Sequence, residues 1–427
     1  MAAIAGSLAA VAALGKLSVG VFAVAMGAIV VVSVGRPWWR FLLVYLAALA
    51  LTGVGLWIAA GQRLMDLGAF TVGAYQIISG YQEAMGRDPP PDQLWLFLAF
   101  PACAAIIAWA AWRSSLRWPS SRRIALAVVA LVLGFALWKV LFVRGHVPVV
   151  FSTAVVSAFA VTGRSADRRS WLVSLLGLGI AFAGASQVQP SAYLNLPGSV
   201  RSLVTEARNV FPPAKLERTA QRTRERLRAQ YRLEPPILAA IVGRTVHVDP
   251  WEAGVAYAYP EFRWAPLPVF QSYGAYTPML DELNTDRLRS PTAPERILRQ
   301  FQPADSLRVE IGRPLRVGEV LPITVDGRFR WFESPAATLE TFCRYRQVAA
   351  TDRWQVLERT GAGCGAPVTI ATVQAAAGTT VPVPEAPAGA FIIARVYGLN
   401  ASPLDRLRTI LLKSVEWYAT LDDTRYR

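Results

Sequence analysis

Three acidic side chains are the residues of this sequence best suited to catalysis. Asp249 and Glu252 lie three positions apart, at the junction of a predicted strand and a predicted helix. This spacing can place two carboxyl groups in one pocket, where one is ionised and the other holds a proton. Glu83 lies in an earlier polar stretch. These three are the predicted catalytic residues, and each would act as a general base or help to bind a divalent cation.

Aromatic and amide side chains accompany the Asp249–Glu252 pair. Flat amphipathic rings stack on sugar rings or line an interface, and an amide adds hydrogen-bonding groups. The predicted substrate-binding residues are Trp251, Trp264, Gln271, Tyr273 and Tyr276. Together with the acids they suit a carbohydrate or a glycolipid headgroup. The alternative is structural: Asp249 caps a helix, Glu252 complements the helix dipole, and the rings form the core of a small layer.

Other catalytic patterns are absent from the sequence. There is no P-loop, no dinucleotide-binding glycine fingerprint, no HExxH and no GxSxG. Two histidines and three cysteines without a CxxC pair argue against zinc, so we predict no metal-ligating residues. The cofactor is therefore unidentified, apart from the divalent cation that the acids would suit.

Composition and apolar runs indicate a membrane protein. Hydrophobic residues make up 53% of the chain, and 14 residues are Trp. Several runs fit or slightly undershoot the roughly 20 residues that cross a bilayer as a helix. The predicted spans are Leu17–Val34, Phe41–Ala60, Leu94–Trp112, Ile124–Val143, Val147–Val161 and Trp171–Ser186.

Loop charges predict the orientation of these six spans. Arginines follow the first, third and fifth runs, which the positive-inside rule assigns to the cytoplasm. They are Arg36, Arg40, Arg113, Arg117, Arg122, Arg123, Arg164, Arg168 and Arg169. Everything after Ser186 then lies outside the cytoplasm, and the expected location is the bacterial cytoplasmic (plasma) membrane. Because basic loops explain much of the net charge of +15, we expect the lipid bilayer and no nucleic acid as a partner.

The fold expected is a multi-pass α-helical membrane domain followed by an extracytoplasmic mixed α/β and β-sandwich-like domain. The predicted parts are a transmembrane domain (1–186), a linker with a basic juxtamembrane helix (187–235), a small α/β layer (236–325) and a β-rich domain (326–427). In the α/β layer we expect Thr245–Asp249, Trp251–Tyr259, Pro268–Gln271, Met279–Leu288 and Ile297–Phe301 to alternate between extended chain and helix, with Thr277 as a helix cap.

The last hundred residues are typical of an antiparallel sheet or sandwich. The expected strands are Phe342–Val348, Trp354–Glu358, Val368–Val373, Phe391–Tyr397 and Thr409–Thr420. Cys343 and Cys364 fall here, in a compartment expected to be oxidising, but the sequence leaves open whether they pair.

Two further segments each have two possible interpretations. Asp66–Ala84 is either part of a solvated loop or a re-entrant or interfacial helix. Ala214–Tyr231 carries many arginines and is either a solvated helix beside the membrane or a basic surface for anionic lipid headgroups or a lipid-linked phosphate.

One string resembles a motif of large, poorly characterised bacterial polytopic membrane proteins: Trp264-x-Pro266-x-Pro268-Val269-Phe270-Gln271-Ser272-Tyr273-x-Ala275-Tyr276-Thr277-x-x-Leu280-Asp281-x-x-Asn284. Ser79–Met85 resembles another piece of the same proteins, and the similarity spans most of the chain. Such proteins look broadly similar to C-type glycosyltransferases with an exported C-terminal domain. Those enzymes usually carry catalytic acids in their first external loop. We expect this chain to be a fragment without its opening helices, so no catalytic residue is carried over.

Two functions are consistent with these features. One is a membrane glycosyltransferase acting on a lipid-linked sugar at the outer face. The other is a non-catalytic envelope protein whose exported domain binds an envelope glycan or a partner protein. A transporter is less favoured, because the spans carry almost no ionisable residues.

Overall fold

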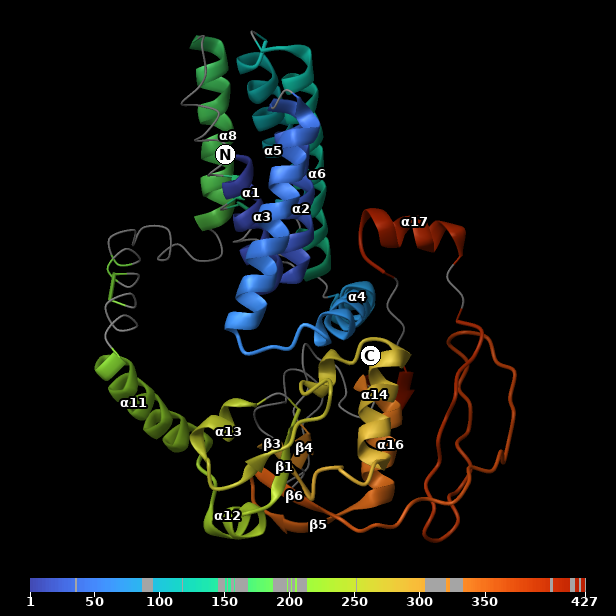
Figure 1. Cartoon of the computed structure of the whole chain (residues 1–427). Coiled ribbons are helices and arrows are strands. Elements are labelled where there is room, and N and C mark those ends of the chain that lie inside the picture. Colours follow the sequence, from blue (N-terminus) through green and yellow to red (C-terminus); the bar gives the residue numbers. More distant parts are fainter. Residues whose placement is uncertain are drawn as a thin grey trace.

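The structure is a computed structural model of the chain, shown in Figure 1. It describes residues 1–34, 37–86, 95–116, 118–144, 150–151, 153–154, 157, 168–186, 198, 201, 204–205, 213–250, 252–303, 320–322, 333–399, 402–414, 419–421 and 424–426. The described part comprises a group of apolar helices in the N-terminal half and a mixed sheet with its own helices in the C-terminal half.

The regular elements described in the N-terminal half are all helices, and short non-helical stretches such as 60–65 connect them. Its helices are α1 (Ala2–Gly15), α2 (Leu17–Val34), α3 (Trp38–Ala59), α4 (Asp66–Met85), α5 (Leu96–Ser114), α6 (Ser120–Arg144) and α8 (Arg168–Ser186). All except α4 run side by side, and α4 lies between this group and the C-terminal half (Figure 1). The stretch 66–84, for which the sequence left loop and helix open, is therefore helical.

Three of these helices are long and apolar enough to cross a membrane, judged by length and composition. The segments are Trp38–Ala59, Leu96–Arg113 and Ser120–Val143. Shorter apolar helices cover Ala2–Gly15, Val19–Ser33 and Trp171–Ala181. The predicted span at 147–161 lies mostly outside the described residues, so the arrangement with six spans stays a prediction.

The C-terminal half is built on one mixed sheet with strand order β2-β1-β3-β6-β5. Strands β1 (Thr245–Asp249), β2 (Arg263–Trp264) and β3 (Arg296–Pro303) are parallel. Helices lie between them in the chain, since parallel strands need a crossover connection. Strands β5 (Tyr345–Ala350) and β6 (Trp354–Arg359) form a hairpin that pairs antiparallel with β3, and β4 (Val320–Pro322) pairs with the end of β3. Two short strands, β7 (Ala419–Leu421) and β8 (Thr424–Tyr426), pair separately.

Helices cover both faces of this sheet. One face packs against α11 (Pro213–Tyr231), α12 (Pro235–Ile241) and α13 (Gly254–Ala258), and the other against α14 (Pro278–Arg289) and α16 (Pro335–Arg344). Because alternate residues of a strand point to opposite faces, Val246 and Val248 enter the first core. His247 and Asp249, which alternate with these valines, therefore point toward the second core.

The predicted basic helix is α11, and part of its charge is used in packing. Arg224 Nε and Arg228 Nε donate to the carbonyl oxygens of Tyr257 and Ala258 at 3.2 and 2.7 Å, and Arg228 also pairs with Glu261. These bonds attach α11 to α13 and its following turn. The arginines of this helix therefore do not all form a free basic surface.

Two expectations about strands are corrected. Residues 268–271 form bends, and the strand beside β1 is β2 instead; Pro266 and Pro268 lack the N–H group that a ladder needs. The β-rich tail is not a separate sandwich, because β5 and β6 complete the sheet of β1 and β3. The sheet thus crosses the expected boundary at 325/326, and residues 360–399, all of which the structure describes, contain no helix or strand.

The remaining expected strands are confirmed only in part. Residues 342–344 end α16 and the strand begins at Tyr345, while Trp354–Glu358 lies within β6. In the stretch 409–420, residues up to Leu411 belong to a helix, α17 (Pro403–Leu411), and Ala419 and Thr420 lie in a strand, while 415–418 are outside the described residues. The amphipathic period of 403–411 is therefore helical rather than alternating.

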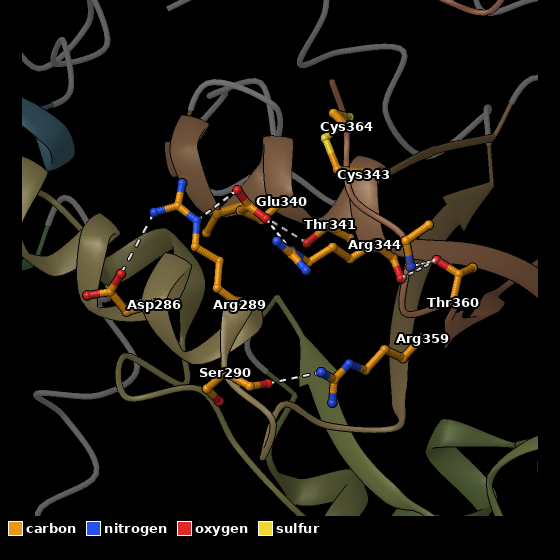
Figure 2. A network of polar contacts seen from close by, with 12 residues as sticks. Asp286, Arg289, Ser290, Glu340, Thr341, Cys343, Arg344, Arg359, Thr360 and Cys364 are labelled. Atoms are coloured by element: carbon orange, nitrogen blue, oxygen red, sulfur yellow. Dashed lines mark hydrogen bonds and ion pairs between the residues drawn. A yellow bond between two sulfur atoms is a disulfide. The ribbon is translucent and has the colours of Figure 1, made fainter. Parts of the chain in front are cut away.

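A polar network joins α14 to α16 at the edge of the second core (Figure 2). Glu340 accepts hydrogen bonds from Arg289 Nε of α14 at 2.9 Å and from Arg344 Nε of its own helix at 2.6 Å. Beside it, Cys343 and Cys364 form a disulfide, which answers the question that the sequence left open. The bond ties the end of α16 to the chain that follows β6.

The Glu340 network predicts a loss of stability in acid. Burial raises the pKa of the Glu340 carboxyl, but the hydrogen bonds from Arg344 and Arg289 outweigh it and leave the pKa below its usual value. A carboxylate with a depressed pKa stabilises the fold above its unfolded pKa, near 4.3, and this contribution disappears as the pH falls through the folded pKa. Urea unfolding should show Glu340→Gln to be less stable at pH 7 by about 1 kcal/mol.

Toward pH 3 the difference between this variant and the unaltered chain should shrink, because the Glu340 carboxyl becomes protonated as the pH falls through its folded pKa. Glu282→Gln is the matched control, because Glu282 also pairs with Arg289 but is more exposed; it should change stability by a few tenths of a kcal/mol at most. A difference between Glu340→Gln and the unaltered chain that is constant from pH 3 to pH 7 would contradict this explanation.

Candidate functional site

The candidate site is built at the C-terminal ends of two parallel strands. Asp249 ends β1, and its register partner on β3 is Arg299. The segment that follows β2 folds back over these strand ends and places the short 3-10 helix η2 (Ser272–Gly274) beside them, with the Ser272 amide donating to Pro250 O at 3.1 Å. Parallel strands thus bring together residues that are about 25 to 50 positions apart in the chain.

Asp249 is held in a buried ion pair. Arg299 Nε donates to Asp249 Oδ2 at 2.9 Å, and Ser272 Oγ donates to Oδ1 at 2.7 Å. Asp249 and Arg299 are only 2% and 4% exposed. Two charges removed from water need each other and additional hydrogen bonds to offset the loss of hydration. Both carboxylate oxygens of Asp249 therefore have partners within the fold.

A small cavity lies between β1 and α16 beside this pair. His247 and Asp249 line one side, and Ala337, Thr338 and Thr341 line the other. Its volume of about 10 Å³ is room for roughly one water molecule. Thr338 Oγ1 is buried there with no hydrogen-bond partner among the described residues, which suits a bound water. A sugar ring does not fit this cavity.

Several motif residues act as anchors for the backbone. Asn284 Oδ1 accepts from the Val269 amide at 2.8 Å, and Asn284 Nδ2 donates to Val269 O at 3.1 Å. Asp281 accepts from Ser334 Oγ and from the amides of Ala336 and Ala337 at 2.6 to 3.0 Å, so it caps the N-terminus of α16. The acid and the amide of the motif therefore connect elements of the fold.

Thr277 caps α14 as the sequence predicts. Its side chain accepts from the Leu280 amide at 3.4 Å, and Pro278 follows it as the first helical residue. This cap lies at the end of the segment 265–277 that connects β2 to α14, and Tyr276 directly precedes it.

Glu252 has a different partner from Asp249. Tyr231 OH of α11 donates to Glu252 Oε2 at 2.8 Å. Burial raises the pKa of the Tyr231 hydroxyl, and the hydrogen bond and charge of Glu252 raise it further, so this tyrosine stays a proton donor. The two acids that the sequence places side by side thus have their hydrogen-bond partners on opposite faces of the sheet.

The predicted substrate-binding residues do not form one cluster in the described structure. Trp264 is 46% exposed at the edge strand β2, and its ring lies 6.1 Å from that of Phe270. Gln271 and Tyr273 are joined by a hydrogen bond of 3.2 Å from the tyrosine hydroxyl to Gln271 Oε1. Trp251 lies outside the described residues.

Tyr276 meets the N-terminal half of the chain. Its ring packs edge-on against Tyr81 of α4, with ring centroids 5.8 Å apart. The backbones also approach closely: a Cβ atom at Gly80 would lie 2.6 Å from Tyr276 Cβ and 2.8 Å from Tyr276 O. Only glycine permits this contact. The two sequence pieces that share the resemblance are therefore in contact, and we call this contact between 80–81 and 276–277 the α4 junction (Figure 1).

Glu83 belongs to the same part of α4. It follows Gly80 by three residues, which is nearly one helical turn, so both lie on one side of the helix. Its side chain is exposed. The neighbouring Gln82 Nε2 donates to Thr409 O at the end of α17, so this turn of α4 contacts two distant segments.

Metal binding receives no support from the described residues. They contain no group of three or more His, Cys, Asp and Glu side chains that could hold an ion. The divalent cation expected from the acids therefore stays a prediction.

Two residues of the site were missed in the sequence. Arg299 carries the charge that neutralises Asp249. The sequence did contain a signal for it: Arg299 follows Ile297 by two positions in a predicted strand, so both side chains lie on the same buried face. Tyr81 was within the second resembling piece, but no sequence pattern connects it with Tyr276.

Comparisons with protein-family models, with curated proteins and with solved structures give no match to this chain. The resemblance carried by 264–284 and 79–85 therefore stays a prediction, and the function has to be argued from the geometry.

Removal of the buried arginine should be costly. Arg299→Met leaves Asp249 without its counter-charge, which should lower the free energy of unfolding by about 3–5 kcal/mol. Arg263→Met is the matched control, since Arg263 pairs at 3.5 Å with Glu295 at an exposed position; it should cost about 1 kcal/mol at most. Urea unfolding of the full chain measures both. An equal, small effect of the two changes would show that the buried pair does not support the fold.

The close contact at Gly80 gives a second prediction. Gly80→Ala forces Tyr276 and Thr277 away from α4, so the amides of Leu280 and Asp281, which both bond to Thr277, should exchange hydrogen faster. Gly73→Ala lies in the same helix with nothing within 4 Å of its new methyl group, and should leave their exchange unchanged while favouring the helix by up to about 1 kcal/mol. Identical exchange in both variants would rule out the contact.

Proposed function

We propose that the chain is an integral membrane protein of the bacterial envelope whose α/β domain binds the polar headgroup of a lipid-linked sugar. The binding region is the α4 junction together with Gln271 and Tyr273. The observation that supports this most strongly is the contact of Tyr81 with Tyr276. It places aromatic rings from both halves of the chain where the α/β domain meets the apolar helices.

The side chains at this place suit a glycolipid. Tyrosine rings offer an apolar face for a sugar and a hydroxyl for a hydrogen bond. Gln271 and Tyr273 add an amide and a third phenol, joined by a hydrogen bond of 3.2 Å. A lipid-linked sugar keeps its lipid among apolar helices and its sugar at their ends, which is the position of the junction in this fold.

Binding is favoured over catalysis by the partners of the candidate acids. Asp249 is neutralised by Arg299 and hydrogen-bonded to Ser272, and Glu252 accepts from Tyr231. A carboxylate that serves as a general base has to reach the proton that it removes. The adjacent cavity holds about one water, so Asp249 has no room for a sugar beside it.

A glycosyltransferase is the second candidate, and Glu83 is the observation in its favour. This acid is exposed on the side of α4 that carries Gly80, so it can reach a headgroup at the junction. In that case Glu83 would serve as the base, or would hold a divalent ion, and the tyrosines would hold the acceptor or donor sugar.

The proposal includes the orientation. Arginines after the first, third and fifth runs support a cytoplasmic position for those loops. The disulfide between Cys343 and Cys364 supports an exported α/β domain, since such bonds persist outside the reducing cytoplasm. Both point to a multi-pass protein of the cytoplasmic membrane with its C-terminal domain outside.

Binding to the full chain in lipid nanodiscs tests the proposal. The probe is a radiolabelled polyprenyl phosphate that carries one hexose, compared with the same lipid without sugar. The glycosylated lipid should bind more tightly, and Tyr276→Ala should weaken it about tenfold, the equivalent of ~1.4 kcal/mol. Tyr397→Ala, at a highly exposed tyrosine, should change nothing. Absence of binding, or equal binding by all variants, would overturn the proposal.

The same sample separates the two candidate functions. Recovery of unaltered probe after long incubation with sugar acceptors supports a binding protein. Transfer of the hexose that is abolished by Glu83→Gln, with the probe still bound, supports the transferase.

A further inference from the structure

The helix α17 exposes an apolar face that nothing in the described structure covers. None of its residues is buried, and the exposed fractions are 74% for Leu404, 51% for Leu407, 60% for Ile410 and 47% for Leu411. At 100° per residue these four side chains fall within one arc of about 120°, with Asp405 on the opposite side and Arg406 and Arg408 at the two borders of the arc.

This helix is stabilised by its own cap. The Ser402 side chain accepts from the Asp405 amide, and the Asp405 side chain accepts from the Ser402 amide at 3.0 Å, which together form a capping box. Pro403 is the first helical residue. A short helix with no buried residues needs such support, so the exposed face is presented by a defined element.

The C-terminal end of α17 is attached to a candidate membrane span. Trp138 Nε1 of α6 donates to Leu411 O at 2.7 Å, and Lys139 Nζ donates to Thr409 O and Leu412 O at 2.7 Å each. The ammonium group thus satisfies carbonyls at the negative end of the helix. In Figure 1 α17 lies across the direction of α6, beside the end of that helix nearest α4.

The attachment sets the depth of α17. Lys139 lies four residues before Val143, where the candidate span ends, and four residues correspond to about 6 Å along a helix. Amphipathic helices that lie in a membrane surface bury their apolar face roughly 5–10 Å into the boundary between headgroups and acyl chains. Trp and Lys are also residues that favour this level of a span.

We propose that α17 is an in-plane membrane helix, whose leucines and isoleucine enter the lipid and whose arginines contact the headgroups. Lipid is the occupant that the position favours, because the apolar face lies level with the last turn of a span rather than against the α/β domain. Arg406 and Arg408 match the charge of anionic lipids. The inference needs α6 to lie in the membrane, but it does not depend on sugar binding.

The helix would also support the α4 junction from the side. Gln82 Nε2 donates to Thr409 O, and Ser414 Oγ donates to Gln82 O at 3.2 Å. The end of α17 is therefore bonded to both α4 and α6. Insertion of α17 in the lipid would hold α4, and with it Tyr81, at a fixed level of the membrane.

Fluorescent labels on the two sides of α17 test this inference. Leu404→Cys and Arg406→Cys each introduce one site for an environment-sensitive dye, and the two positions are about 200° apart around the helix. Both variants of the full chain are placed in vesicles of neutral and anionic phospholipid. The unaltered chain, treated in the same way, measures the background from the buried Cys103.

The label at 404 should emit at shorter wavelength and be quenched by lipids that carry a nitroxide on the acyl chain. The label at 406 should be quenched by aqueous iodide instead. Quenching of both labels by iodide alone would overturn the inference. So would protection of the label at 404 from both quenchers, since that result would mean that protein, such as a second copy of the chain, covers the face.

Discussion

The buried pair of Asp249 and Arg299 is the interaction on which the C-terminal half depends. Removing two charges from water costs several kcal/mol per ion, so the fold has to bring them together with good geometry. Register between β1 and β3 does this, and Ser272 adds a further hydrogen bond to Asp249. One carboxylate thereby connects two strands to the segment that follows β2.

That connection explains the residues of the motif. With Ser272 fixed on Asp249, the chain from Val269 onward is held by Asn284, and Asp281 caps the next helix. These polar side chains are used inside the fold, and Tyr276 is left at its edge, directed toward α4. The motif residues therefore specify a local structure that presents an aromatic residue toward α4.

Local patterns made part of this fold predictable. Alternation identified β1 and β3, and a threonine before proline identified the start of α14, because strand period and helix caps depend on near neighbours. The β-sandwich was wrong because the β-branched and aromatic residues of Val368–Val373 and Phe391–Tyr397 show only that a chain can be extended, whereas strand pairing depends on distant residues. For the same reason the sequence did not reveal all residues of the site. Arg299 is 50 positions from its partner Asp249, and Tyr81 is 195 positions from its partner Tyr276.

The central claim is that the motif segment rests on α4, on the side of the α/β domain that faces the apolar helices. Cross-linking in membranes tests it directly, with Tyr81→Cys and Tyr276→Cys joined by a short bis-maleimide. The account predicts an efficient cross-link within one chain, and little with Gly73→Cys and Tyr276→Cys, because residue 73 lies about 12 Å further along the helix. Equal cross-linking of the two pairs, or none in either, would contradict the account.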